Sequence, residues 1–357
     1  MGQCWRCDWP ECRRDKISLA CFRYPCTLAA MTKLAISIDD IHAAAKRIGS
    51  LALRTPLLEN AALNERLGAR VLIKPEVLQR TGSFKFRGAY NKISGLSADE
   101  RKRGVVAFSS GNHAQGVSAA ARMFGIDAVI VMPADAPAIK MENVRADGAT
   151  VITFDRFKDD RMALVRPYLD AGRILVPPYD DPAIIAGQGT LGLELAEQAA
   201  ELGASLDLVA TPTGGGGLIA GVSTAIKALS PATEIWGAEP EHFDDMRRSL
   251  EADRIVANEP GHRSICDAIL TVQPGELTFP INRQTLAGAV AVSEAQVAAA
   301  MREAASAFRL VVEPGGAVAL AAALAGKFDI KGKTVAIVLS GGNADPKLYA
   351  EIIAGKL

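Results

Sequence analysis

The strongest constraint on the fold is a regular alternation of short apolar runs with helical segments that begins after Met31. The runs are apolar along most of their length rather than at every second residue. They read RVLIKP, GVVAFSS, DAVIVMP, ATVITF, RILVPP, LDLVATPT, EIWGAEP and KTVAIVLSGGN. Strands that are apolar on both faces are typical of parallel sheets covered by helices on both sides. The sequence therefore predicts an α/β fold.

Helical segments fill the intervals between these runs. In SIDDIHAAAKRIGS, Ser37 stands at an N-cap position, and Ile38, Ile41 and Ile48 recur at helical spacing. The segment SFKFRGAYNKISGL is predicted as a helix with Ser83 near its start. The apolar stretch GGAVALAAALAG is too short to span a bilayer and is predicted as a buried helix. Further predicted helices are GNHAQGVSAAARMFG, TLGLELAEQAAELG, GGGGLIAGVSTAIKAL and SEAQVAAAMREAASAF.

Charge and length limit the classes of function. The chain has 357 residues, enough for two domains. Lysine and arginine together number 40, and so do aspartate and glutamate, so no net charge favours nucleic acid or an anionic membrane. We expect a soluble protein with a small-molecule ligand as its partner.

The cysteines are concentrated before Met31. They are Cys4, Cys7, Cys12, Cys21 and Cys26. Their first pair has a spacing that suits zinc, but no second tight pair and no nearby histidine completes such a site. Residues 1–30 are predicted to be a disordered extension, with a zinc module as the alternative. The remainder of the chain has one cysteine, Cys266, which needs no oxidising compartment, and we expect a cytoplasmic protein.

Three strand-to-helix junctions are rich in Gly, Ser and Asn. They are SSGNHAQG (109–116), TPTGGGGLIAG (211–221) and SGGNADP (340–346). In open parallel sheets, ligands bind beyond the carboxyl ends of the strands. The junctions are therefore predicted to form the functional site, although each taken alone is also compatible with an ordinary turn or capping loop.

The four consecutive glycines at 214–217 are the most specific of these features. Their backbone N–H groups are free to converge, and the helix that follows offers its positive N-terminus, which together form a phosphate cradle. The glycines are not followed by the Gly-Lys-Ser/Thr of a nucleoside-triphosphate-binding P-loop. The loop is therefore better suited to a single phosphate group than to a triphosphate. Two alternatives stay open, which are a plain turn and a dinucleotide fingerprint through Gly215, Gly217 and Ala220.

Lys85 lies between two phenylalanines at the expected start of a helix. Burial, the helix N-terminus and nearby Arg87 are each expected to lower the pKa of its amine, which would make it nucleophilic. The alternative is a helix lysine whose stem lies along an apolar surface. A buried lysine together with a cradle for one phosphate suggests pyridoxal 5'-phosphate bound as a Schiff base.

Five motifs in this order resemble the fold-type-II pyridoxal phosphate enzymes, specifically the serine/threonine dehydratase and serine racemase family. The motifs are GSFKFRGA, SSGNHAQG, PTGGGGLIAG, VEPGGAVAL and VLSGGN. The resemblance implies a tryptophan synthase β-like fold with two open, twisted, mostly parallel sheets flanked by helices. It also implies a large cofactor-binding domain (31–100 and 183–357), a small mobile domain (101–182) and a homo-oligomer, either a dimer or a tetramer.

The resemblance assigns the cofactor contacts. It implies that Lys85 forms the Schiff base, that Phe84 packs beside the ring, and that Asn112 bonds the 3-hydroxyl. Ser340 would face the ring nitrogen and, being neutral, would leave it unprotonated. The remaining cofactor-binding residues implied are Gly214, Gly215, Gly216, Gly217 and Leu218 at the phosphate, and Glu313.

The same resemblance implies a substrate site and a metal site. The substrate carboxylate would be held by Ser109, Ser110, Gly111, Asn112 and His113. Ser110 also matches the second acid/base position of the racemases. In GAEPEHFDD, the carboxylates of Glu239 and Asp245 and the carbonyl of Phe243 would bind Mg²⁺ or Ca²⁺, and an ordinary acidic surface loop is the alternative.

The implied activity is β-elimination. L-threonine would give 2-oxobutanoate and L-serine would give pyruvate, each with ammonia. Serine racemase and threo-3-hydroxyaspartate ammonia-lyase share such a site and stay open as alternatives. A histidine or arginine near residues 113 and 145 is the candidate for a second substrate carboxylate. More distant alternatives are a nicotinamide-dependent oxidoreductase and a non-catalytic amino-acid sensor.

Overall fold

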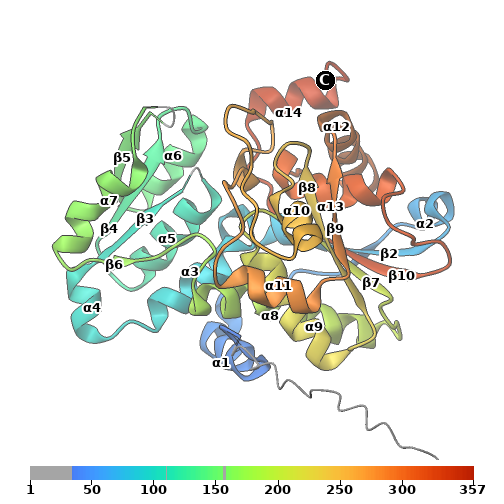
Figure 1. The fold of residues 1–357 in the computed structure, drawn as a ribbon, viewed down its shortest axis with the longest axis horizontal. Coiled ribbons are helices and arrows are strands. Elements are labelled where there is room, and N and C mark those ends of the chain that lie inside the picture. The colour runs from blue at the N-terminus through green and yellow to red at the C-terminus, as the bar shows by residue number, and fades with distance from the viewer. Residues whose placement is uncertain (1–33, 110, 156–157) are drawn as a thin grey trace, which may run out of the picture. The chain divides into compact units, whose positions relative to one another are not determined.

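The computed structural model describes residues 34–109, 111–155 and 158–357. The predicted extension at residues 1–30 and the predicted acid/base residue Ser110 lie outside the described residues. Figure 1 shows that the described strands form two separate sheets with helices packed around each of them. The predicted α/β class and the two mostly parallel sheets are confirmed.

The larger sheet has six strands in the order β1-β2-β10-β7-β8-β9. All neighbouring strands are parallel except β1, which pairs antiparallel with β2. The strands are β1 (Leu58–Glu59), β2 (Arg70–Pro75), β7 (Leu208–Pro212), β8 (Glu234–Pro240), β9 (Gly288–Val292) and β10 (Thr334–Leu339).

The smaller sheet has four parallel strands in the order β5-β4-β3-β6. They are β3 (Val105–Phe108), β4 (Ala128–Pro133), β5 (Thr150–Phe154) and β6 (Ile174–Leu175). This sheet lies within the range predicted for the small domain, whereas the mobility of that domain stays a prediction.

Helices connect the strands. Those of the first half are α1 (Ile38–Ile48), α2 (Ala61–Leu67), α3 (Lys85–Ser94), α4 (Ala98–Arg103), α5 (Asn112–Met123), α6 (Ala138–Ala146) and α7 (Arg161–Asp170). Those of the second half are α8 (Pro182–Glu201), α9 (Gly217–Leu229), α10 (Asp245–Ala252), α11 (Thr278–Thr285), α12 (Glu294–Glu303), α13 (Pro314–Leu324) and α14 (Pro346–Ile353).

Both faces of each sheet are covered, which explains why the strands are apolar throughout. In the larger sheet, Ile337 packs in the cluster that contains α12 and α13, whereas its neighbour Val338 packs with residues of α8 and α9. In the smaller sheet, Val105 faces the cluster of α5, and Val106 faces that of α7. Successive side chains of a strand point to opposite faces, so both faces must be apolar when both are covered.

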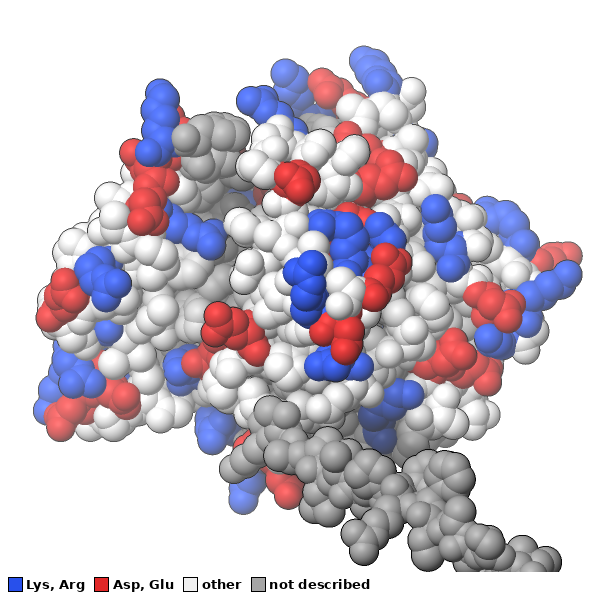
Figure 2. All heavy atoms as spheres, in the orientation of Figure 1, with Lys and Arg blue, Asp and Glu red and all other residues white. Residues whose placement is uncertain are grey.

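The alanine-rich segment predicted as a buried helix is α13. Residues 317–322 of this helix are fully buried, and it packs against α12 and against strands β7 and β10. Small side chains let helix and sheet approach closely. Among the described residues, no helix is both long and apolar enough to cross a membrane. Figure 2 shows basic and acidic side chains interspersed over the visible face.

The helix at Lys85 begins close to Ser83, as predicted. Ser83 does not cap it, because Ser83 is extended and pairs with Gly341 in an isolated β-bridge. The helix starts at Lys85 with Phe84 at the N-cap position, and the N–H of Phe84 donates to the carbonyl of Ser340 at 3.1 Å. The predicted junction at 340–346 is therefore joined by backbone contacts to the segment that precedes Lys85.

Candidate active site

The three predicted junctions converge on one cavity of about 740 Å³. Its lining includes residues from the carboxyl ends of strands in both sheets, as expected for parallel sheets. Among the predicted site residues, the lining contains Phe84, Lys85, Ser109, Asn112, His113, Gly214, Gly215, Gly216, Gly217, Leu218, Phe243, Glu313 and Ser340.

Lys85 projects into this cavity from the first position of α3. Its Nζ donates to the carbonyl oxygen of Pro178 at 2.8 Å and lies 5.1 Å from the centre of the Phe84 ring. Burial lowers the pKa of Lys85 to about 8, although the nearby Glu313 carboxylate opposes this shift. A substantial fraction of the amine is therefore neutral near physiological pH and available as a nucleophile or base.

Arg87 does not contribute to that lowered pKa as the sequence suggested. Its guanidinium is fully buried and donates to Glu76, with Nε–Oε2 at 2.8 Å, and to Glu194. Because these two carboxylates neutralise Arg87, its charge stabilises the buried ion pairs and does not act on the amine of Lys85. Burial is the main cause of the Lys85 shift.

The glycine loop lies under an aromatic ring. A Cβ at Gly215 would lie 2.4 Å from the Tyr179 ring, and one at Gly217 would lie 2.9 Å from Tyr179 Cβ. Gly216, at φ +90°, adopts a backbone conformation that L side chains rarely take. Glycine is thus required by close approach at two positions and by backbone conformation at a third.

The loop fits a phosphate group. Within the described chain, the N–H groups of Gly214, Gly215 and Gly216 donate no hydrogen bond to another backbone group. Gly217 and Leu218 begin α9, so their N–H groups also lack intrahelical partners. Converging free N–H groups at a helix N-terminus form an anion site, and the buried lysine stands in the same cavity. These residues fit pyridoxal phosphate.

Asn112 lies at the first position of α5 and is held from both sides. Its Nδ2 donates to Glu313, and its Oδ1 accepts from Nδ2 of Asn343 at 2.8 Å. Glu313 in turn accepts from the ammonium group of Lys140, with Nζ–Oε2 at 3.2 Å. The sequence did not indicate Lys140, and it indicated Asn343 only as part of the predicted junction 340–346, without a role.

His113 presents a hydrogen-bond acceptor to its surroundings. Its Nε2 lies 2.8 Å from the carbonyl oxygen of Val176, which can only accept, so the ring N–H is committed there. Nδ1 is buried without a partner among the described residues. Burial and the charge of Lys85 lower the pKa of His113 to about 3, so the ring is neutral. The imidazole thus has no N–H left to offer a substrate carboxylate.

The arginine that lines the cavity differs from the one suggested by the sequence. Arg145 is exposed on α6 and does not line the cavity. Arg161, at the start of α7, does line it, and its guanidinium carbon lies 4.7 Å from the centre of the Phe108 ring. Within the described chain, Arg161 has no ion-pair partner. No local pattern in the sequence distinguishes Arg161 from other helix arginines.

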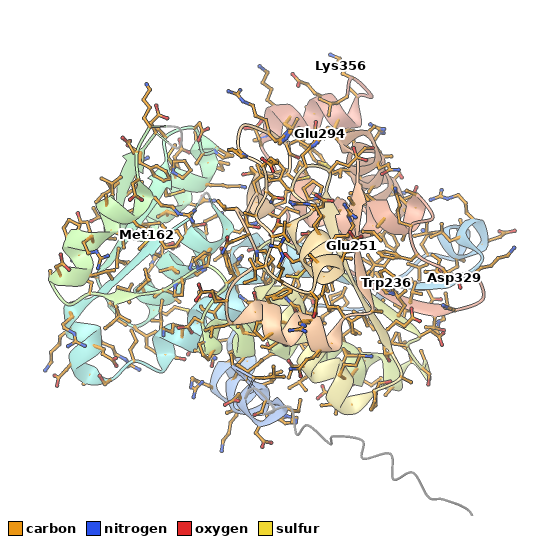
Figure 3. The ribbon with its side chains drawn as sticks, in the orientation of Figure 1. Met162, Trp236, Glu251, Glu294, Asp329 and Lys356 are labelled. Carbon is orange, nitrogen blue, oxygen red and sulfur yellow. The ribbon has the colours of Figure 1, made fainter. Side chains whose placement is uncertain are left out.

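The predicted metal ligands form a buried carboxylate pair. Glu239 accepts from the backbone N–H groups of Met246 and Arg247 in the first turn of α10, both at 2.9 Å. The labelled residue Glu251 belongs to the same helix and helps to find it in Figure 3. Burial and the proximity of Asp245 raise the pKa of Glu239, and burial raises that of Asp245 to about 7. Among the described residues, no group of three or more His, Cys, Asp or Glu side chains is arranged to hold a metal ion.

Comparison with known proteins gives a consistent assignment. The profile of the pyridoxal-phosphate dependent enzyme family matches residues 49–341. The chain is 42% identical over 319 residues to an L-threo-3-hydroxyaspartate ammonia-lyase of Saccharomyces cerevisiae, covering 89% of this chain and 96% of the relative. It is 44% identical over 319 residues to an L-threonine ammonia-lyase of Thermotoga maritima, and the match covers 89% of this chain and 78% of that relative.

A solved structure agrees with the observed fold. Serine racemase from Dictyostelium discoideum superposes with a TM-score of 0.81 at 38% sequence identity, covering 87% of this chain and 99% of that one. The three similar proteins therefore differ in the reaction or substrate that their names state, although their chains align over nearly the same length.

Proposed function

Because the chain belongs to the family of pyridoxal-phosphate-dependent enzymes, we propose that it is an ammonia-lyase that converts L-threonine to 2-oxobutanoate, or L-serine to pyruvate, with release of ammonia. The observation that carries the proposal is the position of Lys85. Its amine, with a pKa lowered to about 8, lies in the same cavity as a glycine loop with free N–H groups.

Three parts of the cavity lining would hold the cofactor. The glycine loop would hold the phosphate, Asn112 would bond the phenolic oxygen, and Ser340 would face the ring nitrogen, since all of them line the cavity. When bound, pyridoxal phosphate supplies an aldehyde for the amine and a conjugated ring that accepts the electron pair freed at the substrate α-carbon. A neutral serine at the ring nitrogen favours rapid loss of a β-substituent over chemistry that requires a long-lived carbanion.

Lys85 is the general base of the proposed reaction. Its amine removes the proton from the substrate α-carbon, and its pKa of about 8 matches that task near neutral pH. The carbonyl of Pro178 accepts from the Lys85 amine and so orients it. Ser109 and the N-terminus of α5 bind the carboxylate of the substrate, with the backbone N–H of His113 rather than its imidazole as a donor.

Reduction and mass mapping test this proposal. The purified protein is treated with borohydride and digested, and the peptide with Lys85 is expected to carry the pyridoxyl mass. The variant Lys85→Ala is expected to lose keto-acid production by orders of magnitude while its circular dichroism stays native. Wild-type turnover by Lys85→Ala, or an active preparation with no label on this peptide, would refute the proposal.

Arg161 favours a second candidate, threo-3-hydroxyaspartate ammonia-lyase. Its guanidinium lines the cavity without an ion-pair partner in the described chain, and a guanidinium suits a second substrate carboxylate. The yeast relative carries that activity in its name. A panel of L-threonine, L-serine, D-serine and both 3-hydroxyaspartates, scored for keto acid and for enantiomer, separates this candidate from the lyase and racemase activities.

A divalent cation is proposed at Glu239, Asp245 and the carbonyl of Phe243. Two buried carboxylates repel each other, and a bound Mg²⁺ or Ca²⁺ would neutralise them. The site is structural in this proposal, since Glu239 and Asp245 do not line the cavity.

A further inference from the structure

A chain of hydrogen bonds runs through the predicted cofactor contact Asn112. The carbonyl of Thr81 accepts from Nδ2 of Asn343 at 2.8 Å, and the same nitrogen donates to Oδ1 of Asn112 at 2.8 Å. Nδ2 of Asn112 then donates to Oε1 of Glu313, whose Oε2 accepts from Nζ of Lys140. These hydrogen bonds join five residues from five separate segments of the sequence.

The direction of this chain is fixed at its first member. A backbone carbonyl can only accept, so Asn343 must turn its amide nitrogen toward Thr81. Asn112 must then present its oxygen to Asn343 and its nitrogen to Glu313, which requires Glu313 to accept. An ionised carboxylate can only accept, whereas a protonated one can also donate and would not fix the amide. One N–H of Asn112 remains, and Asn112 lines the cavity.

The first member of the chain adopts an uncommon backbone conformation. Thr81 has φ 59°, in the left-handed region that β-branched residues avoid. Gly82 follows at φ 71°, and a Cβ there would lie 2.7 Å from Oδ1 of Asn343. Such strain persists only where the surroundings impose it. Here it places the Thr81 carbonyl against the amide of Asn343.

Lys140 is built into the other end of the chain. Its side chain is 1% exposed although it comes from α6, beside the smaller sheet. Its stem passes Gly111, where a Cβ would lie 2.3 Å from Cδ of Lys140. Its Nζ reaches Glu313 at 3.2 Å and Asp267 at 3.0 Å, both on segments that follow the larger sheet's strands β8 and β9 in sequence. A buried ammonium must be paired to stay charged, and two carboxylates pair it.

Four titratable groups surround Glu313. Burial raises the pKa of Glu313, the charge of Lys140 lowers it, and Asp267 raises it. The two carboxylates raise the pKa of Lys140, so Lys140 stays charged. Lys85 interacts with Glu313 across the cavity, and the thiol of Cys266, with a pKa raised by burial to about 12, is neutral. Lys140 is therefore the group in direct contact whose charge favours the ionised form of Glu313.

We propose that Lys140 is a positioning residue for the cofactor: its ammonium group keeps Glu313 an acceptor and thereby turns the remaining N–H of Asn112 toward the phenolic oxygen of the ring. The proposal rests on the proposed function, because it requires bound pyridoxal phosphate. In this proposal the buried ion pair of Lys140 and Glu313 acts on the cofactor through Asn112 and does not contact the substrate.

The test is a pH titration of the visible absorption of the bound cofactor in Lys140→Met. Removal of the positive charge raises the pKa of Glu313. The pH at which the absorption change is half complete, here called the spectral midpoint, is therefore expected to rise by about 1 pH unit or more. The dissociation constant for pyridoxal phosphate, measured by adding it to apoprotein, is expected to rise roughly tenfold, the equivalent of one charge-assisted hydrogen bond. Lys140→Arg keeps the charge and is expected to return the midpoint toward the wild-type value.

Lys74→Met is the matched control. Lys74 is also fully buried and ion-paired, with Nζ 2.7 Å from Glu194, but it does not line the cavity. This variant is expected to unfold at lower temperature with an unchanged spectral midpoint. If Lys140→Met behaves in the same way, Lys140 has only a structural role and the proposal is wrong.

A second variant keeps the test decisive if Lys140→Met does not fold. Glu313→Gln retains Lys140 but places an amide donor against either Lys140 or Asn112. It is expected to weaken cofactor binding and to abolish the pH transition, and an unchanged transition would overturn the proposal. A wild-type protein without any visible absorption band of the cofactor would refute the proposed function itself. If the band is present and its pH dependence is the same in the wild type, Lys140→Met and Glu313→Gln, only the role of Lys140 is refuted.

Discussion

The amine of Lys85 lies 2.8 Å from the carbonyl oxygen of Pro178, the residue immediately before Tyr179. The Tyr179 ring covers Gly215, and the Cβ of Tyr179 lies against Gly217. Asp180 accepts from the backbone N–H groups at the start of α11, at distances between 2.9 and 3.2 Å. The segment from Pro178 to Asp180 therefore holds the proposed nucleophile, covers the glycine loop and connects both to α11. A change in this segment affects all three.

The lowered pKa of Lys85 predicts its reactivity in the apoprotein. Only the neutral amine reacts with an acylating reagent, so labelling of Lys85 should rise with pH, pass half of its maximum near pH 8 and level off above it. Mass spectrometry of the labelled peptide over a pH series measures this. Saturation with pyridoxal phosphate should block the label. A midpoint above pH 10 would mean that burial does not lower the pKa of this amine.

The close contact between Tyr179 and the glycine loop predicts the effect of a single methyl group. In Gly215→Ala the new Cβ would lie 2.4 Å from the ring, so either the ring or the loop must move. We expect at least tenfold weaker binding of pyridoxal phosphate, measured by titration of the apoprotein. Tyr179→Ala in the same chain should recover part of the loss.

Gly95→Ala is the control for this prediction. Gly95 ends α3 with φ −79°, and the nearest atoms to a Cβ there lie at 3.5 Å. It should bind the cofactor as the wild type does. Equal affinities for Gly215→Ala and Gly95→Ala would mean that the glycine loop does not hold the phosphate.

The local part of this site was predictable from the sequence, because the glycine loop, Asn112 and Lys85 each lie at a strand-to-helix junction. Parallel strands bring such junctions to one edge of a sheet. Ser83 lies near the start of α3, as predicted, but a long-range bridge to Gly341 decides its conformation. The expected influence of Arg87 was wrong because its partner Glu194 lies on α8, more than a hundred residues away.

The residues that sequence reasoning missed act through long-range contacts. Lys140 lies 173 residues from Glu313, and Asn343 lies 231 residues from Asn112. Lys140 stands in a segment with an ordinary composition, and packing alone brings it to the site. Asn343 lies in the predicted junction 340–346, but no local pattern shows that it contacts Asn112. Tyr179 could have been suspected as a site residue, since it directly follows the apolar run RILVPP, which was predicted as a strand.

The carboxylate pair Glu239 and Asp245 predicts how a divalent cation affects stability. Without a cation, the pKa of Asp245 is about 7 in the folded protein and lower in the unfolded chain. The folded state then binds more protons, so the free energy of unfolding should fall as the pH rises from about 4 to 7. A cation competes with these protons, and Mg²⁺ or Ca²⁺ should therefore stabilise the protein more at pH 8 than at pH 5.

Urea unfolding with chelator and with each cation measures this effect. Asp245→Asn removes the repulsion without a cation and should be more stable than the wild type in chelator at pH 8, by a few kcal/mol at most, because about 1.4 kcal/mol corresponds to each unit of pKa shift. It should also lose the response to the cation. A wild-type stability that no cation changes at either pH would argue for an acidic loop without a metal.

Arg161 predicts how the enzyme distinguishes a dicarboxylic substrate from a monocarboxylic one. A guanidinium in the cavity wall pairs with a second carboxylate but has no partner on threonine or serine. In Arg161→Met we expect kcat/KM for threo-3-hydroxyaspartate to fall by roughly ten- to a hundredfold, the range of a charge-assisted hydrogen bond lost from the bound substrate. The value for L-threonine should change little, since the amine, carboxylate and β-hydroxyl of threonine are held elsewhere.

Arg145→Met removes an equal charge from α6, outside the cavity, and controls for the loss of long-range attraction between the protein and a dianion. If both variants lose the same fraction of activity and high salt removes the difference from wild type, the effect is attraction at a distance rather than contact. If Arg161→Met instead lowers kcat/KM for both substrates equally, Arg161 positions a group common to them, and selectivity for a second carboxylate must come from another residue.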